Sequence, residues 1–452
     1  MLAPFYYAVP EDIRYGKIYS AEKAELRRIG RLGAEELESE KDEALRKLIH
    51  YAYEHVPYYH NLFDENGISP DDISSEADLP KIPFLTKELV NAHRDELISD
   101  EFDKSQLVYL TTSGSTGTPT GFFVQKESPM REWVYCMNML APFGKKPDDS
   151  KLVMRGKAFK AQEKGKLWQW DAFKRELSIN IFEMTPDNME QYCRAIEKYK
   201  PEFAYGYPSA MYTLCKYIST RQGGLRHQFR GFEAISEGYL PEQREFIEKT
   251  INARMFSFYG MSERVVIATN TPDFDGYEIQ KLYGIAEIAD EAGNIITQPN
   301  VTGEIVGTGL LNYAMPLIRY KTGDLSSWAD SDSLYGEDNA AAGGKRRINP
   351  IAGRCGHDVL IGADGESAMT SLNVHTAALD KVLRYQLQQD EPGTVRIVIA
   401  ANDDFADSDA EEIVREFSRH CSSNITFCVD TQGTVITNKN GKTPLVVQNI
   451  NT

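Results

Sequence analysis

The sequence predicts an α/β protein with a large, multi-sheet N-terminal domain that begins with a helical portion, and a small α+β C-terminal domain. Three observations support this prediction. Residues 21–52 carry Glu, Lys, Arg, Leu and Ala at helical spacing, strand-like and helix-like segments alternate through the middle of the chain, and the pattern changes near Gly353. In addition, 452 residues are too many for one ordinary core, which favours two domains.

The first hundred residues are expected to be mostly helical. The helix over 21–52 is followed by a break at 55–57 (HVP), after which a second, short helix is predicted. The segment 80–87 (PKIPFLTK) then predicts an extended link that enters another helix, capped by Thr86.

A loop rich in glycine and hydroxyl groups follows at 111–121 (TTSGSTGTPTG), between strand-like segments at 107–110 and 122–124. Glycine lets backbone N–H groups turn toward one point, and Ser and Thr add further donors, so the loop suits the oxygens of a polyphosphate. An ordinary polar hairpin turn is the alternative. The chain has no Walker motif, since its Gly-Lys-Thr at 441–443 has Ile436 where the first glycine is required.

The middle of the chain is expected to form βα units on a partly parallel sheet. Strands are predicted at 152–154, 202–205 and 254–258, and helices at 189–198, 208–218 and 240–250. Residues 329–345 are rich in Asp, Ser, Ala and Gly and indicate a surface loop. In the tail, the expected order is helix 371–388, strand 395–400, helix 410–420 and strand 425–429.

Composition excludes several classes of function. A net charge of −17 argues against nucleic-acid binding, which requires a basic surface. The six cysteines are scattered without a C-x-x-C pair, so a zinc site or a disulfide framework is not expected. The eight histidines show no metal-like cluster in the sequence, and only His357 lies near a predicted site. The apolar start at 1–10 is short and broken by two prolines, so it is not expected to be a signal peptide. No apolar stretch in the sequence is long enough to span a bilayer, and a cytoplasmic protein is expected.

Further motifs follow the glycine-rich loop in a fixed order. They are 235–238 (ISEG), 257–263 (SFYGMSE), 315–325 (MPLIRYKTGDL) and the pair formed by 353–354 (GR) and 440–442 (NGK). With these motifs the chain resembles the adenylate-forming superfamily of acyl- and aryl-CoA ligases. It is most similar to the phenylacetate–CoA ligase branch, which includes CapK-like and coenzyme F390 synthetase-like members, because 55–59 (HVPYY) and 79–87 (LPKIPFLTK) are typical of that branch.

The resemblance implies that ATP and Mg²⁺ activate an organic, in this branch often aromatic, carboxylic acid as an acyl-adenylate. The acyl group then passes to an acceptor, for which the thiol of CoA is expected. Residues 1–355 would be the large AMP-binding (adenylation) domain and 356–452 the small mobile domain. The implied partners are a small-molecule acid and an acyl acceptor, and a homodimer is the habit of the branch.

The resemblance also implies roles for single residues. Lys442 would reach the reacting carboxylate, with Lys439 as a nearby competitor, and Glu263 would act in catalysis by holding Mg²⁺. The implied ATP- or AMP-binding residues are Ser113, Gly114, Ser115, Thr116, Gly117, Thr118, Ser236, Glu237, Gly238, Tyr259, Gly260, Met261, Ser262, Asp324 and Arg354. The implied acid pocket includes Tyr135, Tyr205 and Tyr207, although these aromatic residues also suit an ordinary core.

Asp324 would accept hydrogen bonds from the ribose hydroxyls. Tyr259 would pack on the adenine, and Glu237 would border the same pocket. Arg354 would bond the ribose or phosphate side of the nucleotide, with an interdomain salt bridge as an equal alternative, and Arg319 would support the site structurally.

The segment 353–361 (GRCGHDVLI) departs from the family pattern. The first acid of the usual G-R-x-D-D is missing and the spacing is one residue longer, so the hinge is expected at Gly356 or Asp358. The following loop, 362–366 (GADGE), lacks the usual Arg-Gly on the thioester-forming side. An amide or ester ligase acting on an amine or sugar acceptor therefore remains an alternative, as does a non-catalytic, nucleotide-binding scaffold.

Overall fold

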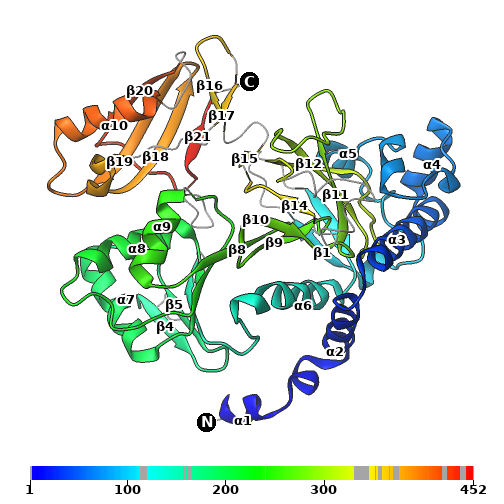
Figure 1. The fold of residues 1–452 in the computed structure, drawn as a ribbon, viewed down its shortest axis with the longest axis horizontal. Coiled ribbons are helices and arrows are strands. Elements are labelled where there is room, and N and C mark those ends of the chain that lie inside the picture. Colours follow the sequence, from blue (N-terminus) through cyan, green and yellow to red (C-terminus); the bar gives the residue numbers. More distant parts are fainter. Residues whose placement is uncertain are drawn as a thin grey trace. The chain divides into compact units, whose positions relative to one another are not determined.

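The computed structural model describes residues 3–111, 120–155, 159, 165–239, 241–329, 346–351, 353–354, 359–365, 367–369, 376–419, 425–437 and 444–450 (Figure 1). By compactness the chain divides into two units. The antiparallel unit comprises Leu2–Phe143 and Phe258–Ile351, and the parallel-sheet unit comprises Gly144–Ser257 and Ala352–Thr452.

The antiparallel unit begins with the predicted helical portion. The helix expected over 21–52 is two helices, because Gly30 ends the first and Gly33 starts the second, where its N–H donates to Glu36 at 2.9 Å. Thr86 caps a helix as expected, since its hydroxyl accepts from the N–H of Leu89. The elements are α1 (Ala3–Ala8), α2 (Glu11–Ile29), α3 (Ala34–His55), α4 (Pro57–Asn66), α5 (Lys87–Ala92), α6 (Ser128–Leu140) and the 3-10 turns η1 (Pro70–Asp72), η2 (Glu76–Lys81), η3 (Lys104–Gln106) and η4 (Ala141–Phe143).

All paired strands in this unit run antiparallel. The predicted strands around the glycine-rich loop are confirmed as β1 (Val108–Thr111) and β2 (Gly121–Val124), which pair with each other. A second set is the end of β8 (Met255–Gly260) with β9 (Ile267–Thr271), β10 (Phe274–Ile279) and β14 (Arg347–Ile348). A third is β11 (Gly284–Ala289), β12 (Gly303–Gly309) and β13 (Tyr320–Ser326). One apolar cluster, with Tyr59, Phe63, Tyr320 and Trp328 fully buried, joins these strands to the helices.

The parallel-sheet unit confirms the predicted βα alternation. Strands β3, β5, β6, β7 and the start of β8 pair in parallel, and β4 pairs antiparallel at one side. Helices α7, α8 and α9 pack on them around a core that includes Leu152, Ile196, Leu214 and Ile247 (Figure 1). The bounds are β3 (Lys151–Met154), β4 (Trp168–Asp171), β5 (Glu176–Ile179), α7 (Pro186–Tyr199), β6 (Phe203–Gly206), α8 (Pro208–Thr220), β7 (Gly231–Ala234) and α9 (Pro241–Ile251).

The tail contains the predicted α+β elements with one correction. The helix expected over 371–388 is wrong where the chain is described, because 382–391 form a strand that pairs antiparallel with β19 and parallel with β21. The described elements are β15 (Gly353–Arg354), β16 (Val359–Ile361), β17 (Ser367–Met369), η8 (Ala377–Lys381), β18 (Val382–Glu391), β19 (Thr394–Ala401), α10 (Asp407–Arg419), β20 (Thr426–Asp430) and β21 (Val446–Gln448). Residues 371–375 and 330–345 lie outside the described ranges.

Buried glutamines explain why the sequence misleads in β18. Glutamine favours helices by intrinsic propensity. Here the amide of Gln386 donates to the carbonyls of Ile436 and Pro444 at 2.9 Å, and Gln388 donates to Gln386 at 2.8 Å. Since the Gln386 side chain is satisfied by carbonyls about 50 residues further along the chain, tertiary contacts override propensity.

No helix within the described ranges combines the length with the apolar character that a bilayer crossing requires.

A buried ion pair fixes the start of β13. The Arg319 guanidinium donates to both oxygens of Glu287 on β11 at 3.0 Å, and to the carbonyl of Ile82 at 2.6 Å. The side chains of Arg319 and Glu287 are 4% and 1% exposed. Burial raises the pKa of Glu287, and Arg319 opposes that rise. Each buried charge is therefore stabilised by its partner, because burial keeps water from solvating it if the partner is removed.

Arg319→Met should lower the free energy of unfolding by about 3–5 kcal/mol, because it leaves the Glu287 carboxylate buried without its partner. Urea denaturation followed by tryptophan fluorescence, to which Trp328 of the same core contributes, measures the loss. The double variant with Glu287→Met serves as control and should recover part of it, since no unpaired charge remains. A loss below about 1 kcal/mol in the single variant would contradict this account.

Candidate functional site

Two predicted site residues, Glu263 and Asp324, meet inside the antiparallel unit. Each carboxylate accepts a hydrogen bond from a tyrosine that lies close in sequence to the other carboxylate. Tyr320, on β13, donates to Glu263 Oε1 at 2.9 Å, and Tyr259, on β8, donates to Asp324 Oδ2 at 2.9 Å. All four side chains are buried, so the two strands share one polar cluster within the core.

The local backbone explains how the carboxylates reach this cluster. Glu263 follows the end of β8 in a turn, where the N–H of Arg264 donates to the carbonyl of Met261 at 3.1 Å. On β13, the Thr322 hydroxyl donates to the carbonyl of Ile305 at 2.8 Å and accepts from the N–H of Asp324 at 3.1 Å. Gly323 has a φ of 79°, a left-handed conformation that glycine adopts without strain, and it turns the following aspartate inward.

Burial sets the charge state of this cluster. It raises the pKa of the Glu263 carboxyl, and the charge of Asp324 adds to the rise, while Tyr320 and Lys87 oppose it. Burial and the neighbouring carboxylates also raise the pKa values of Tyr259 and Tyr320. Both tyrosines therefore stay protonated and act as donors. Two carboxylates held together in this way favour a bound cation.

A lysine that the sequence did not single out belongs to the same cluster. Lys87 starts α5 and is half-buried. A methyl group built on Gly323 would lie 3.3 Å from the Lys87 Nζ atom, so the ammonium lies directly over this glycine. The available signal was the segment 79–87 (LPKIPFLTK), which the sequence flagged as typical of one branch without giving its lysine a role.

The donor set fits a divalent cation such as Mg²⁺. Hard carboxylate oxygens are the protein ligands that this ion prefers, and it commonly takes only one or two of them. Glu263 is 7% exposed, and its carboxylate is ionised only against the cost of burial, which a cation would offset. The chemistry of Glu263 therefore fits a bound cation, and its role as the metal ligand stays a prediction.

Other predicted residues of the antiparallel unit surround this cluster or lie in the core. Gly260 and Ser262 are exposed at the turn, and half-buried Met261 packs on the apolar core. Tyr135, predicted for the acid pocket, is buried on α6, with its ring 5.1 Å from that of Tyr283 in a T-shaped contact. Its observed contacts are those of a packing residue.

The parallel-sheet unit holds the remaining described residues. Ser236 has a φ of 60°, unusual for a residue with a side chain, so the turn with Gly238 is a strained one. The Glu237 carboxylate accepts from the N–H of Ser209 at 3.2 Å at the start of α8, and its charge acts on Arg384 of β18. Tyr207 is buried ahead of α8.

Tyr205 differs from the other predicted pocket aromatics because cations surround its ring. Lys151 and Lys145 place their Nζ atoms 5.1 and 5.6 Å from the ring centroid. Arg155 donates to the Tyr205 hydroxyl at 3.3 Å. The ring therefore lies in a positive environment, and its face is already engaged by cation–π contacts.

Part of the predicted site lies outside the described residues. This holds for the phosphate loop (Ser113, Gly114, Ser115, Thr116, Gly117 and Thr118), for Lys442 and Lys439, and for the hinge candidates Gly356 and Asp358. The backbone of Arg354 is described, in β15.

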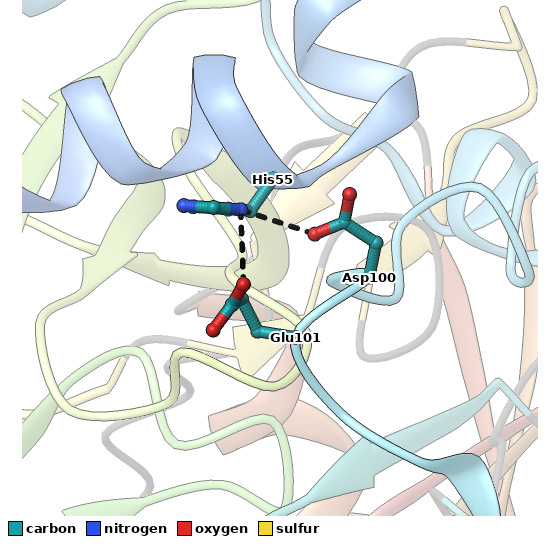
Figure 2. Close-up of side chains that lie close together, drawn as sticks. All are labelled: His55, Asp100 and Glu101. Carbon is teal, nitrogen blue, oxygen red and sulfur yellow. Dashed lines mark hydrogen bonds and ion pairs between the residues drawn. The ribbon is translucent and has the colours of Figure 1, made fainter.

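One histidine cluster corrects the expectation that the sequence holds none. Figure 2 shows His55, on α3, facing two carboxylates, with Nδ1 3.1 Å from Asp100 and 3.7 Å from Glu101. The sequence missed it because Asp100 and Glu101 are distant in the chain and reach His55 through a hydrogen bond from the N–H of Asp100 to its carbonyl. Both carboxylates are exposed, and they attract a protonated imidazole without any ion, so the cluster carries no metal assignment.

Glu263→Gln should gain stability relative to the unchanged protein as the pH rises in metal-free buffer. Because burial raises the pKa of Glu263 in the folded state, ionisation costs stability above the ordinary value near 4.5, whereas glutamine has no such cost. Urea unfolding of both proteins between pH 4 and 8 measures the difference, which should be smallest at the acidic end. A difference that does not change with pH would contradict the burial argument.

Comparison with known proteins identifies the family of the chain. Residues 34–312 match the model of the AMP-binding enzyme family. The chain is 22% identical to protein CapK of Staphylococcus aureus over 97% of this chain and 94% of that protein. It is 28% identical to the phenylacetate-coenzyme A ligase of Pseudomonas putida over 76% of each chain.

A solved structure confirms the predicted α/β fold. The structure of 2-hydroxyisobutyryl-CoA ligase in the postadenylation state, in complex with R3-HIB-AMP, has a TM-score of 0.68 at 17% identity and covers 92% of this chain and 90% of that chain. At this identity the likeness concerns the fold. Since the family model matches more than half of the residues, the chain belongs to the AMP-binding enzyme family.

Proposed function

We propose that this protein is an ATP-dependent ligase that activates an organic carboxylic acid as an acyl-adenylate and passes the acyl group to CoA. The observation that carries the proposal is the buried pair of Glu263 and Asp324, each hydrogen-bonded by a tyrosine, in a chain of the AMP-binding family. Such a pair offers one carboxylate for a metal and one for the hydroxyls of a ribose.

The first half-reaction needs positive charge around the phosphates. A carboxylate oxygen of the acid attacks the α-phosphorus of ATP, the bond to the bridging oxygen breaks, and pyrophosphate leaves. When bound, Mg²⁺ would neutralise phosphate charge and so ease this approach. Glu263 would hold the ion, and the N–H and hydroxyl groups of 113–118 would hold the phosphates.

The described residues include most of those that would bind the nucleoside of ATP. Tyr259 donates to Asp324 Oδ2, and the same carboxylate would accept from a ribose hydroxyl, since each of its oxygens can take more than one hydrogen bond. Ser236, Glu237 and Gly238 would border the adenine, and Arg354 would bond the ribose or the phosphate side. An orienting donor on Asp324 fixes the nucleotide before the acid reacts.

The second half-reaction transfers the acyl group. The thiol sulfur of CoA attacks the acyl carbon, the thiol loses its proton, and AMP leaves. Residues 356–452 would form a small mobile domain against a large domain of 1–355, so that Lys442 is present for adenylation and withdrawn for transfer. We also propose that the enzyme works in the cytoplasm, with a homodimer as the assembly to test.

An amine or hydroxyl acceptor is the second candidate. The observation that favours it is the altered segment 353–366, which lacks both the first acid of the usual G-R-x-D-D and the Arg-Gly of the thioester-forming side. Mass spectrometry of the products formed with CoA, or with a panel of amines and sugars, separates the two candidates. A CoA thioester as sole product would exclude the second.

Incorporation of labelled pyrophosphate into ATP should depend on an added carboxylic acid. Each acid of an aromatic and aliphatic panel is tested with the purified protein and Mg²⁺, and omission of the acid is the control. Activity with one class of acid identifies the substrate class. If every acid fails while ATP still binds, the non-catalytic scaffold replaces the ligase proposal.

Lys442→Ala should reduce this exchange by at least about 10²-fold, because a positioned cation is lost from the reacting carboxylate. Affinity for ATP, measured by calorimetry, should stay nearly unchanged. Lys439→Ala is the matched control, since it removes a neighbouring lysine of the same segment. Exchange that survives Lys442→Ala but not Lys439→Ala would transfer the role to Lys439.

Glu263→Gln should weaken binding of ATP in the presence of Mg²⁺ by at least ~10-fold, because the ion loses a charged ligand. Binding in excess chelator should be similar in both proteins. If Mg²⁺ enhances binding equally in the variant, Glu263 does not hold the metal.

A further inference from the structure

The segment before α5 is fixed against β13 by three kinds of contact. Leu85 exchanges backbone hydrogen bonds with the strand. Its N–H donates to the carbonyl of Arg319 at 3.0 Å, and its carbonyl accepts from the N–H of Lys321 at 2.9 Å. The Ile82 carbonyl accepts from the Arg319 guanidinium, which also lies 4.1 Å from the centroid of the Phe84 ring. These contacts hold the backbone that carries Lys87 beside the strand that carries Asp324.

The Lys87 ammonium is thereby brought to the carboxylate cluster. It lies over Gly323, the residue before Asp324, and its charge acts on the Glu263 carboxyl. Thr86 caps the first turn of α5 and so fixes where the Lys87 side chain leaves the backbone. The ammonium therefore faces the pair from a third element of the same unit.

An ordinary structural lysine would form an ion pair here. Its neighbours do so: Lys81 lies 2.7 Å from Asp78, Lys104 2.6 Å from Asp95, and Lys321 2.9 Å from Glu304. Across the described ranges, by contrast, no ion pair joins Lys87 to a carboxylate, although its charge acts on Glu263 and its Nζ atom lies over Gly323, next to Asp324. A half-buried ammonium held close to carboxylates but not bonded to them leaves room for an anion between the charges.

We propose that Lys87 is a substrate-binding residue whose ammonium contacts a phosphate group of the adenine nucleotide held by Glu263 and Asp324. This inference rests on the proposed function of that site. A phosphate is the matching anion, because Lys presents a compact charge with three donors. The lysine would act with the metal on Glu263, so that charge on the phosphate is balanced from two sides.

Binding measurements on three variants test the proposal. Lys87→Gln removes the charge, Lys87→Arg keeps it, and Lys81→Gln is the matched control from the same segment, since Lys81 pairs with Asp78 at an exposed position. Calorimetry with Mg²⁺ measures the affinity of each protein for ATP, AMP and adenosine. A thermal melt of each variant confirms that it is folded.

Lys87→Gln should lower the affinity for ATP by about 10- to 100-fold, which corresponds to the loss of one hydrogen bond to a charged group. Adenosine binding should change by less than about 2-fold, and Lys87→Arg should restore most of the affinity for ATP. An equal loss for AMP would place the contact at the α-phosphate, and an unchanged AMP affinity would place it at the β- or γ-phosphate. Either result supports the proposal.

Two results would overturn it: an unchanged affinity for ATP in Lys87→Gln, or an equal loss for adenosine and ATP. The second would mean that Lys87 only maintains the shape of the site. Because the readout is binding alone, it remains decisive even if no carboxylic acid supports pyrophosphate exchange. Failure of the ligase proposal and failure of the Lys87 proposal are therefore separate outcomes.

Discussion

The antiparallel unit depends on one buried guanidinium. Arg319 pairs with Glu287 on β11, donates to Ile82 and lies against Phe84, while its own N–H donates to the Thr308 hydroxyl on β12 at 3.0 Å. Its φ of 51° turns the chain at the start of β13. A single residue thus ties the segment before α5, which leads to Lys87, and β13, which carries Asp324, to strands β11 and β12.

The tyrosines explain how two carboxylates remain together in a buried place. Like charges this close repel each other, and each needs its own donor. Tyr320 serves Glu263 and Tyr259 serves Asp324, so each strand stabilises the acid that the other strand presents. The arrangement couples the position of β8 to that of β13. For the proposed reaction, this means that the metal ligand and the ribose ligand are fixed by the same pair of contacts.

Much of the fold could be predicted from the sequence, because the residues that determine these elements are neighbours along the chain. The strands around the glycine-rich loop, the Thr86 cap and the alternation from β3 to α9 are set by hydrophobic spacing and capping residues. The sequence predicts a helix where β18 forms, because the Gln386 side chain is satisfied by carbonyls far along the chain that local pattern does not reveal. Motifs also singled out Glu263 and Asp324, which the fold places in one buried polar cluster. The motifs did not single out Lys87, because it comes close to Gly323 only through pairing between distant segments. Spacing along the chain does not reveal such pairing.

Gly323 has two separate reasons to be glycine. Its left-handed backbone disfavours any side chain, and the volume above it is occupied by the Lys87 ammonium. The backbone constraint on residue 323 therefore holds whatever residue stands at position 87. A shorter residue at 87 would relieve the crowding over 323 but not the backbone constraint, so the glycine would persist in lineages that had already lost the lysine. Retention of the glycine alone is weak evidence for the cation, and relatives should be compared at both positions together.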